Sequence, residues 1–133
     1  MLPYNVHHVA IAVHDLDSSL DTFRLLYGAI PLRREVVESQ GVEEAMIAIG
    51  GSHLQLLQPL DPTSPVGRFL ASHGEGLHHI ALAVPDIVAA IGHLERIEAP
   101  LIDHEPRPGG DGTMIAFVHP RSFGGTLVEL VEV

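Results

Sequence analysis

Two short segments of the chain share one alternation of apolar and polar positions. Residues 7–13 read HHVAIAV and residues 78–84 read HHIALAV, so five of the seven positions are identical at an offset of 71 residues. Because side chains alternate across a strand, each segment predicts a strand with one histidine and two alanines on one face and branched residues on the other. The repeat indicates a chain built from two copies of one module.

A helix is expected directly after the first strand of each half. In the first half we expect Asp17 as the N-cap and Gly28 as the residue that ends the helix. In the second half we expect Asp86 as the N-cap and the segment 99–100, an alanine before a proline, as the end. The apolar positions at helical spacing are Leu16, Leu20, Phe23, Ile87, Ala90, Ile91 and Leu94.

Three strand-like runs follow each expected helix. They cover Ile30–Ser39, Val42–Gly50, Ser52–Gln58, Leu101–Glu105, Thr113–His119 and Thr126–Val133. The last run of each half is again similar, since LQLLQ at 54–58 corresponds to VELVE at 128–132. The sequence therefore predicts an α+β fold of two βαβββ modules, paired by pseudo-twofold symmetry, with a curved mixed sheet that forms a cup.

Length and composition favour one compact domain over residues 1–133. The chain has 133 residues, of which 46% are hydrophobic and 18% are charged, as is typical of a globular protein. We expect module one at about 5–60, a linker helix at about 61–75 and module two at about 76–133.

Charge and cysteine content exclude several classes of function. The net charge of −10 disfavours a surface for nucleic acid or anionic membrane. The chain has no cysteine, so a metal would have to be bound through histidine, carboxylate or amide side chains. The first residues lack the pattern of a signal peptide, and we expect a cytoplasmic protein.

Four polar side chains occupy equivalent places in the two halves. His8 and His79 share strand faces with alanines, while Gln55 and Glu129 interrupt apolar strands. A buried polar group without a partner costs about 1 to 3 kcal/mol, so these residues need partners. A single histidine on a strand is more often an ordinary core or surface residue. Its repetition favours four ligands to one divalent cation.

The quoted motifs, together with further segments, resemble a known family along essentially the whole chain. These segments are ESQGVEEAMI at 38–47, LQLLQPLDPTSPVGRFL at 54–70, GEGLHHIALAV at 74–84, EPRPGG at 105–110 and IAFVHPRSFGGTLVELVE at 115–132. They are similar to the vicinal oxygen chelate superfamily and, within it, to the methylmalonyl-CoA epimerase family. The most specific are GEGLHHIALAV at 74–84 and the pair of segments within 105–132.

The resemblance implies a site in named residues. The family's metal ligands correspond to His8, Gln55, His79 and Glu129, and its catalytic carboxylate, which follows a Gln-Gly-Val segment, corresponds to Glu44. Glu129 would be the second proton-transferring group. The family implies Co²⁺ as the metal, with Mn²⁺, Ni²⁺, Zn²⁺ or Mg²⁺ as alternatives, and it implies a homodimer.

Two further points concern how the family's site corresponds to residues of this chain. Residue 7 is histidine where the family commonly has aspartate, which could alter the hydrogen bonding around the first ligand. The arginines available for the phosphates of CoA are Arg33, Arg34, Arg107 and Arg121. Of these, Arg121 with Ser122 lies in the HPRS segment that matches the family, and we take this pair as the candidate substrate contact.

The resemblance implies interconversion of (R)- and (S)-methylmalonyl-CoA by two-base α-proton transfer. A lyase of the glyoxalase I type is an alternative, although it would more usually have glutamate at position 55. An extradiol dioxygenase could use His8, His79 and Glu129 on Fe(II). A binding protein without catalysis would keep the fold, but such proteins often lack the ligands that are present here.

Overall fold

A computed structural model describes residues 2–133 of the chain, which form two compact units. One unit is residues 8–78, and the other combines residues 2–7 with residues 79–133. The strands β1 (Asn5–Ala12) and β5 (Gly76–Val84) each contain one of the boundaries between units. Of the described helices, none is both long and apolar enough to cross a membrane.

The unit of residues 8–78 contains the strand order β2-β3-β4-β1. Its elements after β1 are α1 (Leu16–Tyr27), β2 (Pro31–Val37), the 3-10 helix η1 (Glu38–Gln40), β3 (Val42–Ile49), β4 (Ser52–Pro59) and α2 (Pro65–His73). Strand β3 is antiparallel to β2 and to β4, and β4 is parallel to β1. These bounds confirm the strands expected in the first half, and α2 lies in the expected linker.

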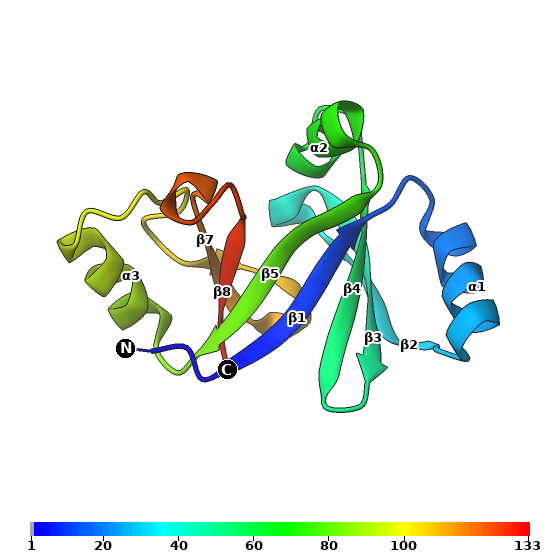
Figure 1. Cartoon of the computed structure of the whole chain (residues 1–133), viewed down its shortest axis with the longest axis horizontal. Coiled ribbons are helices and arrows are strands. Elements are labelled where there is room, and N and C mark those ends of the chain that lie inside the picture. Colours follow the sequence, from blue (N-terminus) through cyan, green and yellow to red (C-terminus); the bar gives the residue numbers. More distant parts are fainter. Residues whose placement is uncertain (1) are drawn as a thin grey trace. The chain divides into compact units, whose positions relative to one another are not determined.

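The other unit repeats the plan with the order β5-β8-β7-β6. Its elements after β5 are α3 (Ile87–Arg96), β6 (Arg107–Pro108), η2 (Gly110–Gly112), β7 (Met114–Val118), η3 (Pro120–Ser122) and β8 (Val128–Glu132). Strand β8 is parallel to β5 and antiparallel to β7. In each unit the helix that follows the first strand packs beside the sheet, α1 against β3 and β4 and α3 against β7 and β8 (Figure 1), and α2 also contacts β4.

The predicted strand at Leu101–Glu105 is wrong. The structure has only an isolated bridge from Leu101 to Val118, and the two-residue strand β6 follows further along. The carboxylate of Asp103 accepts a hydrogen bond of 2.8 Å from the backbone N–H of Phe117. A side chain therefore takes a place that a backbone carbonyl would hold in a regular ladder.

The two helix N-termini were predicted with unequal success. Asp86 caps α3 as expected, because its Oδ1 accepts a hydrogen bond of 3.0 Å from the backbone of Ala89. The expectation that Asp17 caps α1 is wrong, since the cap is Asp15, whose Oδ1 accepts from the backbone of Ser18 at 3.2 Å. Asp17 lies one residue inside the helix, where its carboxylate accepts a hydrogen bond from Arg34. The helix ends at Gly28 as predicted, with φ at 66°.

We predict that the two aspartates of α1 contribute unequally to stability. Asp15→Ala should lower the free energy of unfolding by about 0.5 to 2 kcal/mol, because it removes an N-cap hydrogen bond. Asp17→Ala, which breaks only an exposed ion pair with Arg34, should cost about 1 kcal/mol or less. Urea denaturation of both variants measures the difference, and a larger loss for Asp17→Ala would contradict the assignment of the cap.

The sheet of residues 8–78 has one apolar face and one face that carries polar groups. On the α1 side, Leu16 of the helix packs in a buried cluster that includes Ala45, Ile47 and Leu56. On the opposite side, Ala10, Ala12 and Leu57 pack beside α2 in a second cluster. This second face also carries the side chains that strand alternation assigned to the site.

The other unit divides in the same way. Under α3, the buried residues include Val84, Ile91 and Leu130. The opposite face holds Ala81, Ile115, Phe117 and Val131 as a separate cluster. In both units the catalytic candidates therefore lie on the face that the module helix leaves uncovered.

Candidate active site and metal centre

The register of the parallel strands places the candidate ligands of each unit equivalently. In the unit of residues 8–78, Ala10 on β1 is opposite Gln55 on β4. In the other unit, Ala81 on β5 is opposite Glu129 on β8. Each candidate histidine, two residues before its alanine, is therefore on the same face as the amide or carboxylate of the neighbouring strand. The internal repeat read from the sequence is thus also a repeat of hydrogen-bond register.

All five predicted ligands and bases are buried. The relative exposures are 3% for His8, 0% for Glu44, 5% for Gln55, 3% for His79 and 3% for Glu129. Ionisable and amide groups at such depth are costly unless they bind a partner, so these residues are not part of a solvated strand face and each needs a partner.

Glu44 is held between groups from the two strands that flank it. The Nη1 of Arg33 on β2 donates to its Oε1 at 2.7 Å, and the Nε2 of Gln55 on β4 donates to its Oε2 at 2.5 Å. The arginine supplies a positive charge beside a side chain with no exposed surface. Each oxygen of this buried carboxylate therefore accepts a hydrogen bond, one of them from a charged donor.

The amide of Gln55 has one oxygen without a hydrogen-bond partner. Its Nε2 is committed to Glu44, while its buried Oε1 accepts no hydrogen bond from any described residue. Leaving such an acceptor unpaired costs about 1 to 3 kcal/mol. An amide oxygen is a suitable ligand for a divalent cation. The unpartnered Oε1 of Gln55 therefore fits the metal that the family implies.

In the other unit, His79 and Glu129 form a second pair. The Nε2 of His79 lies 3.4 Å from the Oε2 of Glu129. The ring of Phe117 meets the imidazole of His79 edge-on, with the ring centroids 5.4 Å apart. An imidazole nitrogen and a carboxylate oxygen at this distance are an arrangement that can bind one cation in common.

His78, next to the second candidate ligand, belongs to a different environment. Its ring contacts the ring of Phe69 edge-on at 4.8 Å between centroids. Burial lowers the pKa of His78 to about 4, so this imidazole is neutral at pH 7. The two consecutive histidines of the motif thus face different surroundings, as the strand alternation predicted.

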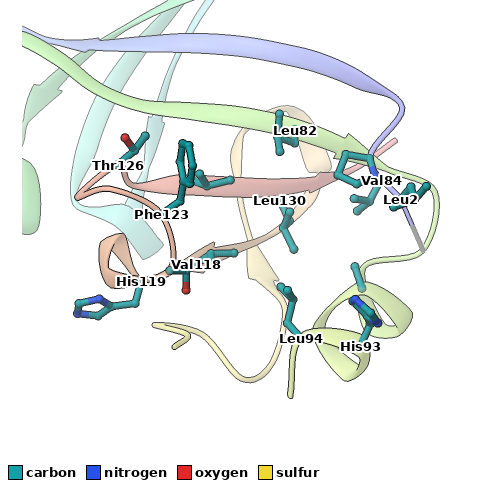
Figure 2. A pocket seen from close by; sticks show the side chains of 14 residues that line it. Leu2, Leu82, Val84, His93, Leu94, Val118, His119, Phe123, Thr126 and Leu130 are labelled. Carbon is teal, nitrogen blue, oxygen red and sulfur yellow. The ribbon is translucent and has the colours of Figure 1, made fainter. Parts of the chain in front are cut away.

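A pocket of about 270 Å³ lies between α3 and the strands of its unit (Figure 2). Its walls include Leu82, Val84 and Leu130, which alternate along β5 and β8 with the residues of the opposite face. Among the predicted site residues only Ser122 reaches it. This pocket is therefore separate from the buried polar groups of Glu129 and His79.

The arginines offered for CoA differ in their surroundings. Arg34 is bound to the carboxylates of Glu43 and Asp17, whose hydrogen bonds raise the pKa of its guanidinium. Arg121 is exposed on η3, whereas the Oγ of Ser122 donates to the carbonyl of Pro100 at 2.7 Å. We therefore leave Arg34 out of the nucleotide site.

Arg107 lies beside the polar face of its own unit. Its guanidinium carbon is 5.3 Å from the ring centroid of Phe117, and its Nε is 3.3 Å from the Oδ2 of Asp103. From the sequence alone, Arg107 was one of four candidate arginines for the phosphates of CoA. Its place between an aromatic ring and a carboxylate depends on the loop before β7.

The contact that sequence reasoning missed is the one between Arg33 and Glu44. The signal that could have found it is the hairpin at 37–42, since strands that meet there bring alternate residues of β2 opposite alternate residues of β3. Val37 pairs with Val42, and Glu35 pairs with Glu44. Arg33 then follows on the same face of β2.

The comparisons with known proteins agree on one family. Residues 7–117 match the model of the Glyoxalase/Bleomycin resistance protein/Dioxygenase superfamily. The ethylmalonyl-CoA/methylmalonyl-CoA epimerase of Cereibacter sphaeroides is 36% identical over 130 residues, which cover 96% of this chain and 97% of that protein. These matches confirm the superfamily that the sequence motifs indicated.

Two solved structures are similar over nearly the whole chain. One is a methylmalonyl-CoA epimerase variant of Streptomyces coelicolor in complex with 2-nitronate-propionyl-CoA, and the other is a methylmalonyl-CoA epimerase in complex with methylmalonyl-CoA and NH4+. Each has a TM-score of 0.94 and 40% sequence identity, and each match covers 98% of this chain and 95% of the solved chain. The predicted fold class is confirmed by this similarity.

Proposed function

We propose, because the chain belongs to the Glyoxalase/Bleomycin resistance protein/Dioxygenase superfamily, that it interconverts (R)- and (S)-methylmalonyl-CoA. The observation that carries the proposal is the end-to-end similarity to epimerases, one of them in complex with methylmalonyl-CoA. The buried carboxylates of Glu44 and Glu129 supply the two proton-transferring groups that the reaction needs.

We infer that His8, Gln55, His79 and Glu129 together hold one divalent cation, with Co²⁺ as the first candidate. The unpartnered Oε1 of Gln55 and the proximity of His79 to Glu129 support this set. When bound, the cation would act as a Lewis acid toward the negative charge that develops on the substrate oxygens. Two nitrogen and two oxygen ligands suit several divalent ions, so the identity of the metal is a matter for measurement.

The proposed mechanism assigns one of the two carboxylates to each face of the reacting carbon. Glu44 accepts the α-proton of one epimer, and the electron pair of that C–H bond moves toward the thioester carbonyl. Glu129 then donates a proton, carried on the carboxylate oxygen that would not hold the cation, to the opposite face of the same carbon, which inverts its configuration. In the reverse direction the two residues exchange roles, and solvent exchange resets their protonation.

The acyl-CoA substrate also needs contacts at its nucleotide end. We propose Arg121 for the phosphates, because its guanidinium is exposed and forms a bidentate donor. Ser122 stays a weaker candidate, since its hydroxyl already donates to Pro100. The homodimer stays a prediction that follows from the resemblance, and the cytoplasmic location stays a prediction from the pattern of the first residues.

The test of the proposed function is an epimerisation assay on the purified protein with metal analysis of the same sample. Each epimer of methylmalonyl-CoA is incubated in D2O, and α-proton exchange and inversion are followed by NMR. We expect both, together with close to one divalent ion per chain. Absence of turnover, with activity instead on a glutathione hemithioacetal or with a catechol and oxygen, would replace the proposal by one of its alternatives.

A further inference from the structure

Glu44 is a buried acid that lies directly opposite another acid. The cross-strand register pairs Glu35 of β2 with Glu44 of β3. Like charges at directly opposed positions of a sheet repel each other and destabilise the pairing. Because Glu44 has no exposed surface, water cannot screen this repulsion on its side.

Arg33, on the same strand as Glu35, supplies a positive charge to both carboxylates. Its Nη1 donates to Glu35 and also to the Oε1 of Glu44, the latter at 2.7 Å. The side chain of Arg33 is 25% exposed, whereas that of Glu44 is fully buried. The guanidinium therefore reaches inward from a half-buried position to a carboxylate in the interior.

The two oxygens of Glu44 are bound from opposite sides. Arg33 on β2 binds Oε1, and Gln55 on β4 binds Oε2 at 2.5 Å, while Glu44 itself lies on β3 between these strands. Donors on both oxygens restrict rotation about the terminal torsion of glutamate, which is otherwise broad. The plane of the carboxylate is thus set by its two neighbouring strands.

The next arginine of the same strand shows the contrast. Arg34 points to the other face of β2, where it binds Glu43 and Asp17. The side chains of these carboxylates are 28% and 78% exposed. Arg34 is therefore a surface ion pair on the same strand, and it contacts none of the groups assigned to proton transfer.

We propose that Arg33 is a positioning residue that holds the carboxylate of Glu44 in the orientation for proton transfer at one face of the substrate. This inference rests on the proposed function and adds a residue to it. The physical reason is that proton transfer depends on sub-ångström placement, and a misplacement of about 1 Å costs about 100-fold in rate. The loss of Arg33 leaves only Gln55 of these two donors on the carboxylate.

The test compares Arg33→Met with Arg34→Met in the full-length, metal-loaded protein. α-Proton exchange in D2O is measured separately for each epimer of methylmalonyl-CoA, together with KM and the thermal midpoint. The face served by Glu44 is defined by the epimer whose exchange is lost in Glu44→Gln. Arg33→Lys is the conservative variant, which keeps the charge but not the planar fork.

For Arg33→Met we expect exchange at the Glu44 face to fall by about 10- to 100-fold, with KM within about threefold and exchange at the other face retained. Arg33→Lys should recover part of the loss, and Arg34→Met should exchange both epimers at the unaltered rate. If Arg33 had only a structural role, its loss would lower the exchange rates at both faces together with the thermal midpoint. That result would overturn the inference.

The failure of the inference is distinguishable from that of the proposed function. If Glu44→Gln loses exchange at one face while Arg33→Met keeps it at the unaltered rate, the role of Arg33 is refuted and the proposed function stands. If the unaltered protein exchanges neither epimer, the proposed function is wrong and the role of Arg33 is overturned with it. If Arg33→Met does not fold, Arg33→Lys decides the same question through the ratio of its exchange rates at the two faces.

Discussion

Replacing Glu44 with glutamine should abolish measurable epimerisation, with kcat lowered by about 100- to 10,000-fold, the range that one general base contributes. Glutamine has nearly the same shape, but its amide cannot accept the α-proton. Exchange in D2O should be lost for one epimer of methylmalonyl-CoA and kept for the other, because in the proposed mechanism Glu129 serves the opposite face. Substrate affinity should change little, since the carboxylate contributes to proton transfer rather than to binding of the CoA moiety.

Glu43→Gln is the matched control for that substitution. Glu43 is the preceding residue of β3, and its side chain faces the other way, where it pairs with Arg34. This variant should epimerise the substrate at close to the unaltered rate. If Glu44→Gln retained exchange from both epimers, Glu44 would have no part in the proton transfer, and the assignment of the first base would be wrong.

Removing the bound metal should abolish activity, and Gln55→Leu should reproduce most of that loss. The reason is the amide of Gln55, whose Nε2 is fixed by Glu44 while its buried Oε1 lacks a hydrogen-bond partner. Leucine has a similar volume and offers no oxygen. We expect the affinity for Co²⁺ to fall by about 100-fold or more. Substituting a group that only supports a metal ligand lowers the affinity by up to about 100-fold, and the loss of a ligand itself should cost at least as much.

Stability measurements test the same prediction without an assay of turnover. A ligand at a concentration of 100 times its Kd adds about 2.7 kcal/mol to the free energy of unfolding. The unaltered protein should show this gain when Co²⁺ is added to the metal-free form, and Gln55→Leu at the same concentration should show less than about half of it. Isothermal titration gives the affinity directly.

Gln58→Leu is the control for Gln55→Leu on the same strand. The Oε1 of Gln58 accepts a hydrogen bond of 2.7 Å from the backbone of Leu16 at the start of α1, so its role is to support a helix N-terminus. This variant should be less stable than the unaltered protein but should keep the full gain on adding Co²⁺. An equal loss of the metal effect in both variants would contradict the assignment of Gln55 as a ligand.

The sequence by itself determined which residues are buried polar groups and on which strands they lie. The alternation of HHVAIAV and HHIALAV assigned His8 and His79 to one face, and both are buried there. The same parity selected Gln55 and Glu129, and the resemblance to the family indicated Glu44; these three residues have at most 5% exposure. Alternation is a local property of an extended backbone, so it can be read without knowing any contact between strands.

Only the tertiary structure decided which groups these residues bind. The contact of Arg33 with Glu44 depends on the register across a hairpin, and the contact of Asp103 with the backbone of Phe117 depends on a loop that approaches β7. Asp15 rather than Asp17 caps α1 because of backbone angles at one residue. Such partners are chosen by register and loop geometry over long separations in sequence, where local periodicity carries no information.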